Sequence, residues 1–116
     1  ALRELSATAA SRTNGCIFCA SVHSRFASHH SKRPDDVQRL LDEGTAAPQD
    51  DPQWRAVIDA SVALTRIPDE FGADHVRALR EAGLDDVAII DAINGAAFFN
   101  WANRLMLSLG EPTPAQ

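Results

Sequence analysis

The 116-residue sequence contains no tyrosine, a single methionine and only two cysteines. Two cysteines are too few for the disulfide framework of a small secreted domain, and a close pair in a cytosolic protein is more often catalytic or metal-binding. No apolar run reaches 18 residues, and the mixed polar and apolar N-terminal stretch does not resemble a signal peptide. We therefore expect a cytoplasmic protein that does not interact with membranes.

The chain also has fewer basic than acidic residues. The chain has 11 Lys and Arg against 16 Asp and Glu, a net charge of −5, which argues against a nucleic-acid-binding protein. With 45% hydrophobic residues and this length, residues 1–116 are expected to form one globular domain. Because the chain lacks an initiating methionine and opens inside a helical pattern, we expect that an N-terminal segment of a longer protein is missing.

Signals for β-strands are scarce as well. Sustained alternation of apolar and polar residues is absent, and the Asn14-Gly15 pair has helical patterns on both sides. Apolar residues instead recur at helical spacing, punctuated by Gly and Pro. The expected helices cover residues 2–13, 16–30, 34–44, 52–67, 72–84 and 85–110. Asp85 is the expected N-cap of the last helix, and Gly110 and Pro112 are expected to end it. The sequence therefore predicts an all-α fold of about six helices.

The last expected helix is apolar on more than one side. Its apolar residues are Val87, Ile89, Ile90, Ile93, Ala97, Phe98, Phe99, Trp101, Leu105, Met106 and Leu109. A helix that is apolar on most sides must be buried on most sides, which a bundle this small cannot achieve alone. We expect part of this helix to form a homo-oligomer interface, and Asn100, Asn103 and Arg104 to tie helices or subunits together by hydrogen bonds.

The stretch "NGCIFCASVH", residues 14–23, carries the chemistry of the chain. Residues three and four apart share one face of a helix, so Cys16 lies next to Cys19, and Cys19 next to His23. Such a pair can form a disulfide, but the closed loop is too small for it to stabilise the fold much. A disulfide that forms and breaks is the favoured interpretation. The alternatives are a zinc site and two buried thiols that pack as small hydrophobic residues.

The residues alone do not decide which thiol is the nucleophile. The positive end of the helix dipole favours a thiolate at Cys16, whereas a histidine base favours Cys19. Positions 19, 23, 26 and 30 share a face, so Phe26 is expected to exclude water, and His30 is either a second proton relay or a residue of the helix end. Zinc would use Cys16, Cys19, His23 and His30, although structural zinc ligands usually come in two separated pairs.

Glu4, the "CIFC" tetrad and His23 together resemble the Glu…Cys-x-x-Cys-x-x-x-His signature of the AhpD-like branch of the carboxymuconolactone decarboxylase superfamily. The stretch "AINGAAFFNWANRLMLSLGEP" resembles the C-terminal helix of the peroxidase-related members, so the resemblance covers nearly the whole chain. It implies an AhpD-like helical bundle that assembles into trimers or hexamers. It also implies an alkylhydroperoxidase-like thiol peroxidase or disulfide reductase. The decarboxylase branch lacks the cysteine pair, so lactone decarboxylation is not expected.

The resemblance also implies a role for each site residue. Cys19 attacks the hydroperoxide, Cys16 resolves the resulting sulfenic acid into a disulfide, and Glu4 with His23 relays protons. An external thiol or dithiol then reduces the disulfide, with no metal or organic cofactor. The founding members carry a histidine between the two cysteines, where this chain has Ile17 and Phe18. Glu4 is therefore expected to reach His23 directly or through a water.

Overall fold

Six α-helices make up the secondary structure of the described part of the chain. The structure is a computed structural model and describes residues 1–110. The helices are α1 (Leu2–Asn14), α2 (Ile17–Ser31), α3 (Pro34–Glu43), α4 (Pro52–Thr65), α5 (Ala73–Glu81) and α6 (Asp86–Leu109). Because no strand occurs between residues 1 and 110, the predicted all-α fold of about six helices is confirmed.

The helix ends follow the punctuation of the sequence, with small shifts. Gly15 adopts the left-handed conformation (φ 75°) that ends α1, and the Asp85 side chain caps α6 by accepting the Ala88 N–H at 2.8 Å. Helix α4 ends at Thr65, two residues before the expected end, and α5 spans only Ala73–Glu81 of the expected 72–84. Pro112, the expected stop after α6, lies outside the described residues.

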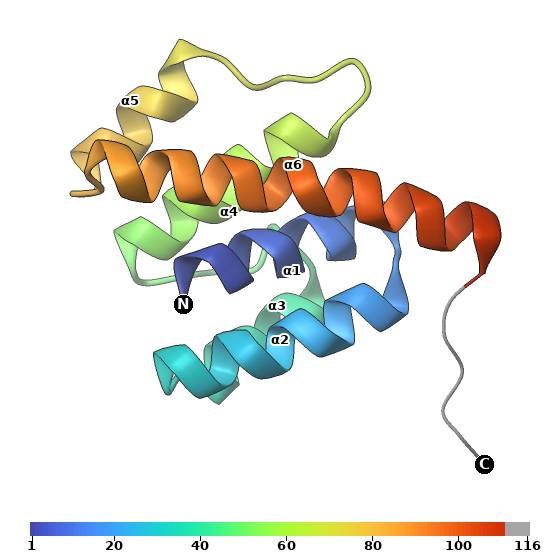
Figure 1. The fold of residues 1–116 in the computed structure, drawn as a ribbon. Helices are drawn as coiled ribbons and strands as arrows, with labels where there is room; N and C mark the ends of the chain where they lie inside the picture. The colour runs from blue at the N-terminus through green and yellow to red at the C-terminus, as the bar shows by residue number, and fades with distance from the viewer. Residues whose placement is uncertain (111–116) are drawn as a thin grey trace.

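Helix α1 is the central element of the bundle. It packs against α2, α4 and α6, and Figure 1 shows it running between α6 and α2. Its consecutive residues 5–11 are all buried, and most of them are Ala, Ser or Thr, which lets neighbouring helices approach on every side. Apart from Leu5 of α1, the large side chains of the core come from the surrounding helices and include Leu40, Trp54, Val57, Ile58, Leu79 and Ile89.

Helix α6 lies close against α1 at Gly95. A Cβ atom at Gly95 of α6 would overlap Ser6 Oγ and lie 3.3 Å from the Arg3 carbonyl oxygen, so the contact requires glycine. This contact fixes how far α6 is shifted along α1, and so which α6 residues reach the N-terminal end of α2. Within residues 1–110, none of the helices combines the length and the apolar character needed to cross a membrane.

Candidate active site

Glu4 and His23 meet directly across two helices. Glu4 Oε2 of α1 lies 2.6 Å from His23 Nδ1 of α2, and the side chains are 25% and 17% exposed. The Phe99 ring of α6 meets the imidazole edge-on, with ring centroids 4.0 Å apart. A histidine held by a carboxylate on one nitrogen and by an aromatic ring has a fixed orientation, which is what a positioned base requires.

The two cysteines lie at the N-terminal end of α2. Cys16 is the N-cap residue just before the helix, and its N–H donates to the Ser11 carbonyl at the end of α1. Cys19 is the third residue of α2 and therefore lies one turn before His23. The Sγ atoms are 2.7 Å apart without a disulfide, and the residues are 0% and 2% exposed. The four residues expected at the site are thus brought together by one helix pair.

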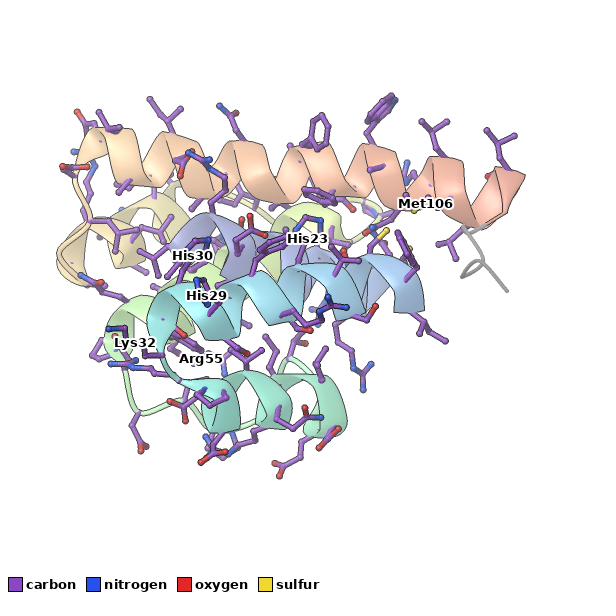
Figure 2. All side chains as sticks on the ribbon, turned by 60° about the horizontal axis from the view of Figure 1, so that its bottom comes forward. His23, His29, His30, Lys32, Arg55 and Met106 are labelled. Atoms are coloured by element: carbon purple, nitrogen blue, oxygen red, sulfur yellow. The ribbon has the colours of Figure 1, made fainter. Side chains whose placement is uncertain are left out.

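Helix α6 adds a residue that the sequence did not single out. Met106 Sδ lies 3.2 Å from Cys19 Sγ, and Figure 2 shows Met106 on α6 toward the N-terminal end of α2. Together with Phe99 it closes the site from the α6 side. No sequence pattern marks these two positions, because which α6 residues face α2 depends on how far α6 is shifted along α1.

A polar network anchors α6 beside the cysteines. Asn14 Nδ2, two residues before Cys16, donates to Asn100 Oδ1 at 2.8 Å and Asn103 Oδ1 at 3.1 Å. Asn103 is fully buried and donates to Ser11 Oγ, while Asn100 donates to Thr65 Oγ1. The expectation that Asn100 and Asn103 tie helices together is confirmed within the subunit. Within residues 1–110 the structure shows no such bond for the exposed Arg104, whose predicted tie remains a prediction.

The far half of α2 differs from expectation. Phe26 does not shield the cysteines, because it is 50% exposed and stacks on His30 with centroids 6.5 Å apart. His30 is itself exposed at the end of the helix. It lines, with Glu4, a cavity of about 410 Å³ between the starts of α1 and α6. The i, i+7 spacing places Phe26 two helical turns beyond Cys19, where its half-exposed ring packs against His30 and not over the thiols.

Cavities adjoin the cysteine pair rather than enclose it. A cavity of about 350 Å³ lies between α1, α2 and α3 and is lined by Cys16, Arg12, Gln38 and Asp42 among others. A larger cavity, about 710 Å³, lies between the end of α4 and α6, and neither cysteine lines it. Among residues 1–110, no group of three or more His, Cys, Asp or Glu side chains is placed to hold a metal ion. The arrangement suits thiol chemistry assisted by proton transfer.

Comparison with known proteins gives the same fold and family. The chain superposes on an uncharacterized peroxidase-related protein from Silicibacter sp. TM1040 with a TM-score of 0.80 and 28% identity. The AhpD core of an uncharacterized peroxidase-related protein from Ralstonia eutropha JMP134 gives a TM-score of 0.80 and 26% identity. Each match covers 97% of this chain but only 59% of the other, so the chain spans about three-fifths of their length.

A third solved structure shares the fold at lower identity. It is a protein of unknown function from Agrobacterium tumefaciens whose description names AhpD and antioxidant defence, with a TM-score of 0.74, 22% identity and coverage of 99% and 78%. No curated protein gives a significant match. The model of the carboxymuconolactone decarboxylase family matches residues 1–63, which carry the cysteine pair, Glu4 and His23. The chain therefore belongs to the carboxymuconolactone decarboxylase family and has the AhpD-like fold.

Proposed function

We propose that this protein reduces hydroperoxides with the Cys16–Cys19 dithiol, as an alkylhydroperoxidase-like thiol peroxidase. The observation that carries the proposal is the direct contact between Glu4 and His23, 2.6 Å long, one helical turn from Cys19. A buried dithiol needs no such partner for packing. A carboxylate that orients a histidine next to a thiol is the arrangement that activates a cysteine nucleophile.

The proton relay begins at Glu4. Because the carboxylate accepts from Nδ1–H of His23, the Nε2 atom is the nitrogen left to exchange a proton with Cys19. Removal of the Cys19 proton gives a thiolate at the third residue of α2, where the unpaired N–H groups of the first turn favour negative charge. The relay replaces one that would pass between the cysteines, where this chain has Ile17 and Phe18.

The reaction then follows from the two sulfur atoms. The Cys19 thiolate attacks the distal oxygen of the hydroperoxide, the O–O bond breaks, and the leaving alkoxide takes a proton from His23. Cys19 becomes a sulfenic acid, and Cys16, whose Sγ lies 2.7 Å from Cys19 Sγ, displaces water from it to form the disulfide. An external thiol or dithiol restores both thiols by exchange. No step needs a metal or an organic cofactor.

We also propose that the subunit works as a homo-oligomer, a trimer or hexamer, assembled through α6. The outer side of this helix carries large apolar side chains that are 41% to 82% exposed: Val87, Ile90, Phe98, Trp101, Leu105 and Leu109. A continuous apolar side of this kind on a soluble fold marks an interaction surface.

The intact mass of the protein before and after one equivalent of cumene hydroperoxide tests the chemistry. The wild type is expected to lose two hydrogens, and Cys16→Ser to gain one oxygen that a sulfenic-acid trap captures. His23→Gln should slow this oxidation by about 100-fold, the usual contribution of a positioned base. His29→Gln is the matched control, because His29 is exposed on the same helix and should leave the rate unchanged.

Other outcomes point to another class of protein. Reversible disulfide formation without turnover, when a dithiol is supplied, would identify a non-enzymatic oxidation sensor. Stoichiometric zinc that blocks oxidation would identify a metal-binding protein. Equal rates for His23→Gln and His29→Gln would remove the relay from the mechanism.

A further inference from the structure

Met106 lies against the thiol proposed as the nucleophile. Its Sδ atom is 3.2 Å from Cys19 Sγ, and the side chain is half-buried whereas Cys19 is 2% exposed. In Figure 2, Met106 projects from α6 beside the N-terminal end of α2. A hydroperoxide whose oxygen reaches Cys19 Sγ therefore also contacts the sulfur of Met106, which is the only methionine of the chain.

A thioether reacts with a hydroperoxide without the help of a base. The sulfur lone pair attacks the distal oxygen, the O–O bond breaks and a sulfur–oxygen bond forms. The hydroxyl proton moves to the leaving alkoxide, so the products are a methionine sulfoxide and an alcohol. The methionine is oxidised by two electrons and the hydroperoxide is reduced by two. The hydroperoxide supplies the oxygen, and no further reactant is needed.

We infer that Met106 is a second oxygen acceptor of this site, and that its oxidation slows the reaction of Cys19. The inference rests on the proposed function, since it requires a hydroperoxide next to Cys19. Once Cys19 is joined to Cys16 in a disulfide, its sulfur can no longer attack a hydroperoxide. Met106 Sδ is then the reduced sulfur nearest to the site, and excess hydroperoxide transfers its oxygen there.

The sulfoxide changes the surroundings of Cys19. A thioether sulfur is a weak hydrogen-bond acceptor, whereas the sulfoxide oxygen is polar and lies within reach of the Cys19 S–H. When the sulfoxide oxygen accepts a hydrogen bond from the thiol, it favours the protonated form of Cys19, which is not the nucleophile. Excess hydroperoxide would therefore lower the reaction rate of Cys19. Methionine sulfoxide reductases reverse this oxidation and would restore the rate.

The test compares two methionines in one molecule. Cys19→Ser removes the competing thiol, and Leu107→Met adds a reference on the same helix at a position that is 51% exposed. Cumene hydroperoxide is added, and peptide mass spectrometry follows the sulfoxide at both positions. Met106 should be oxidised at least about fivefold faster than the introduced methionine, because the site holds the hydroperoxide near it. Oxidation that follows exposure, with the introduced methionine equal or faster, would overturn the inference.

The effect on Cys19 is measured in the protein with both cysteines. The Met106 sulfoxide form is prepared, its disulfide is reduced with a dithiol, and the rate of Cys19 oxidation by cumene hydroperoxide is recorded. We expect a rate at least about fivefold lower than before the treatment, restored by a methionine sulfoxide reductase. Met106→Leu taken through the same treatment should keep its own starting rate. An unchanged rate in the sulfoxide form would overturn the switch.

Failure of this inference differs from failure of the proposed function. If Cys19 of the wild type reacts with the hydroperoxide but Met106 of Cys19→Ser shows no preference over the reference, only the inference fails. If Cys19 does not react while Met106 is still preferred, the peroxidase proposal fails, and Met106 remains an oxygen acceptor.

Discussion

Helices α4 and α6 share two sequence features but have different surroundings. Each starts with an aspartate cap, Asp51 or Asp85, and each carries one of the two tryptophans of the chain. Trp54 of α4 is 4% exposed, whereas Trp101 of α6 is 59% exposed. Helix α4 packs against α1, α5 and α6, while α6 packs one side against α1, α4 and α5, and within residues 1–110 its other side is left exposed.

The difference in exposure between Trp54 and Trp101 reflects the surroundings of the two helices. A side chain with an apolar area as large as that of tryptophan is unfavourable to leave in water, so the exposed Trp101 fits the proposed assembly of subunits through α6. In α4 the core of one subunit buries the tryptophan. In α6 the buried residues are Ile89 and the small or polar Ala92, Gly95, Ala96 and Asn103, whereas Trp101 and most of the other large apolar residues are exposed.

Among the substitutions considered, replacing each tryptophan by alanine should show the largest difference in stability between α4 and α6. Trp54→Ala removes a fully packed side chain and should lower the free energy of unfolding by about 4 kcal/mol. Trp101→Ala should cost less than about 1 kcal/mol in the isolated subunit, because the side chain has few neighbours there. Urea denaturation at low protein concentration measures both. Equal losses would mean that Trp101 is covered within the subunit and that the comparison is wrong.

The close contact on the inner side of α6 gives the next largest effect. Gly95→Val places carbon atoms into Ser6 Oγ and the Arg3 carbonyl, and should lower the free energy of unfolding by about 3 kcal/mol. Asn94→Val is the matched control, because Asn94 is the exposed neighbour on the same helix. Thermal denaturation compares the two variants. A loss at Asn94 as large as that at Gly95 would show that helix propensity, and not the contact with α1, sets the cost.

The outer side of α6 should affect assembly rather than folding. Trp101→Glu places a charge in the centre of the exposed apolar side and should weaken association of subunits by at least about tenfold. Analytical ultracentrifugation over a range of concentrations measures the change, and circular dichroism should show unchanged helix content. Arg25→Glu, at an exposed position of α2, provides a comparison for a change of charge away from α6. A wild type that is monomeric at every concentration would refute assembly through this side.

The sequence predicted the helices well because their signals are local. Gly15, Asp85 and Pro52 act within one helical turn, so the number of helices and most of their bounds could be derived from the chain alone. The exposure of Phe26 could not be derived from the chain alone. It depends on how the neighbouring helices pack over that part of α2, which no local pattern encodes.

The candidate site also contains residues that the sequence could predict and residues that it could not. The spacing of Cys16, Cys19 and His23 within one segment was sufficient to predict their proximity. The Glu4–His23 contact joins two helices and was expected only from the family signature, and the structure shows it to be direct. Phe99 and Met106 reach the site because Gly95 allows α6 to lie close on α1, a tertiary cause that the sequence reveals only after the packing is known.

The smallest effect concerns the cap of α4. Burial raises the pKa of Asp51, but hydrogen bonds from Arg33 and from the N–H groups of Gln53 and Trp54 outweigh this and leave the pKa below its ordinary value. The folded state therefore binds this proton more weakly than the unfolded state. The stabilisation is fully present above the pKa of the unfolded chain and is lost as the pH falls through the lower folded pKa.

Asp51→Asn should consequently lower the free energy of unfolding by about 1 kcal/mol or less at pH 7, since asparagine also caps helices but loses the charge. The difference from the wild type should shrink as the pH falls below about 4, where the wild-type carboxylate is protonated as well. Urea denaturation from pH 7 to pH 3 measures it. Arg33→Gln, which removes the ion pair 2.8 Å long but keeps both backbone contacts, should remove part of the pH dependence. A difference that stays constant down to pH 3 would show that Asp51 stabilises α4 through its shape and hydrogen bonds alone, and that the charge at this end of the buried helix contributes nothing.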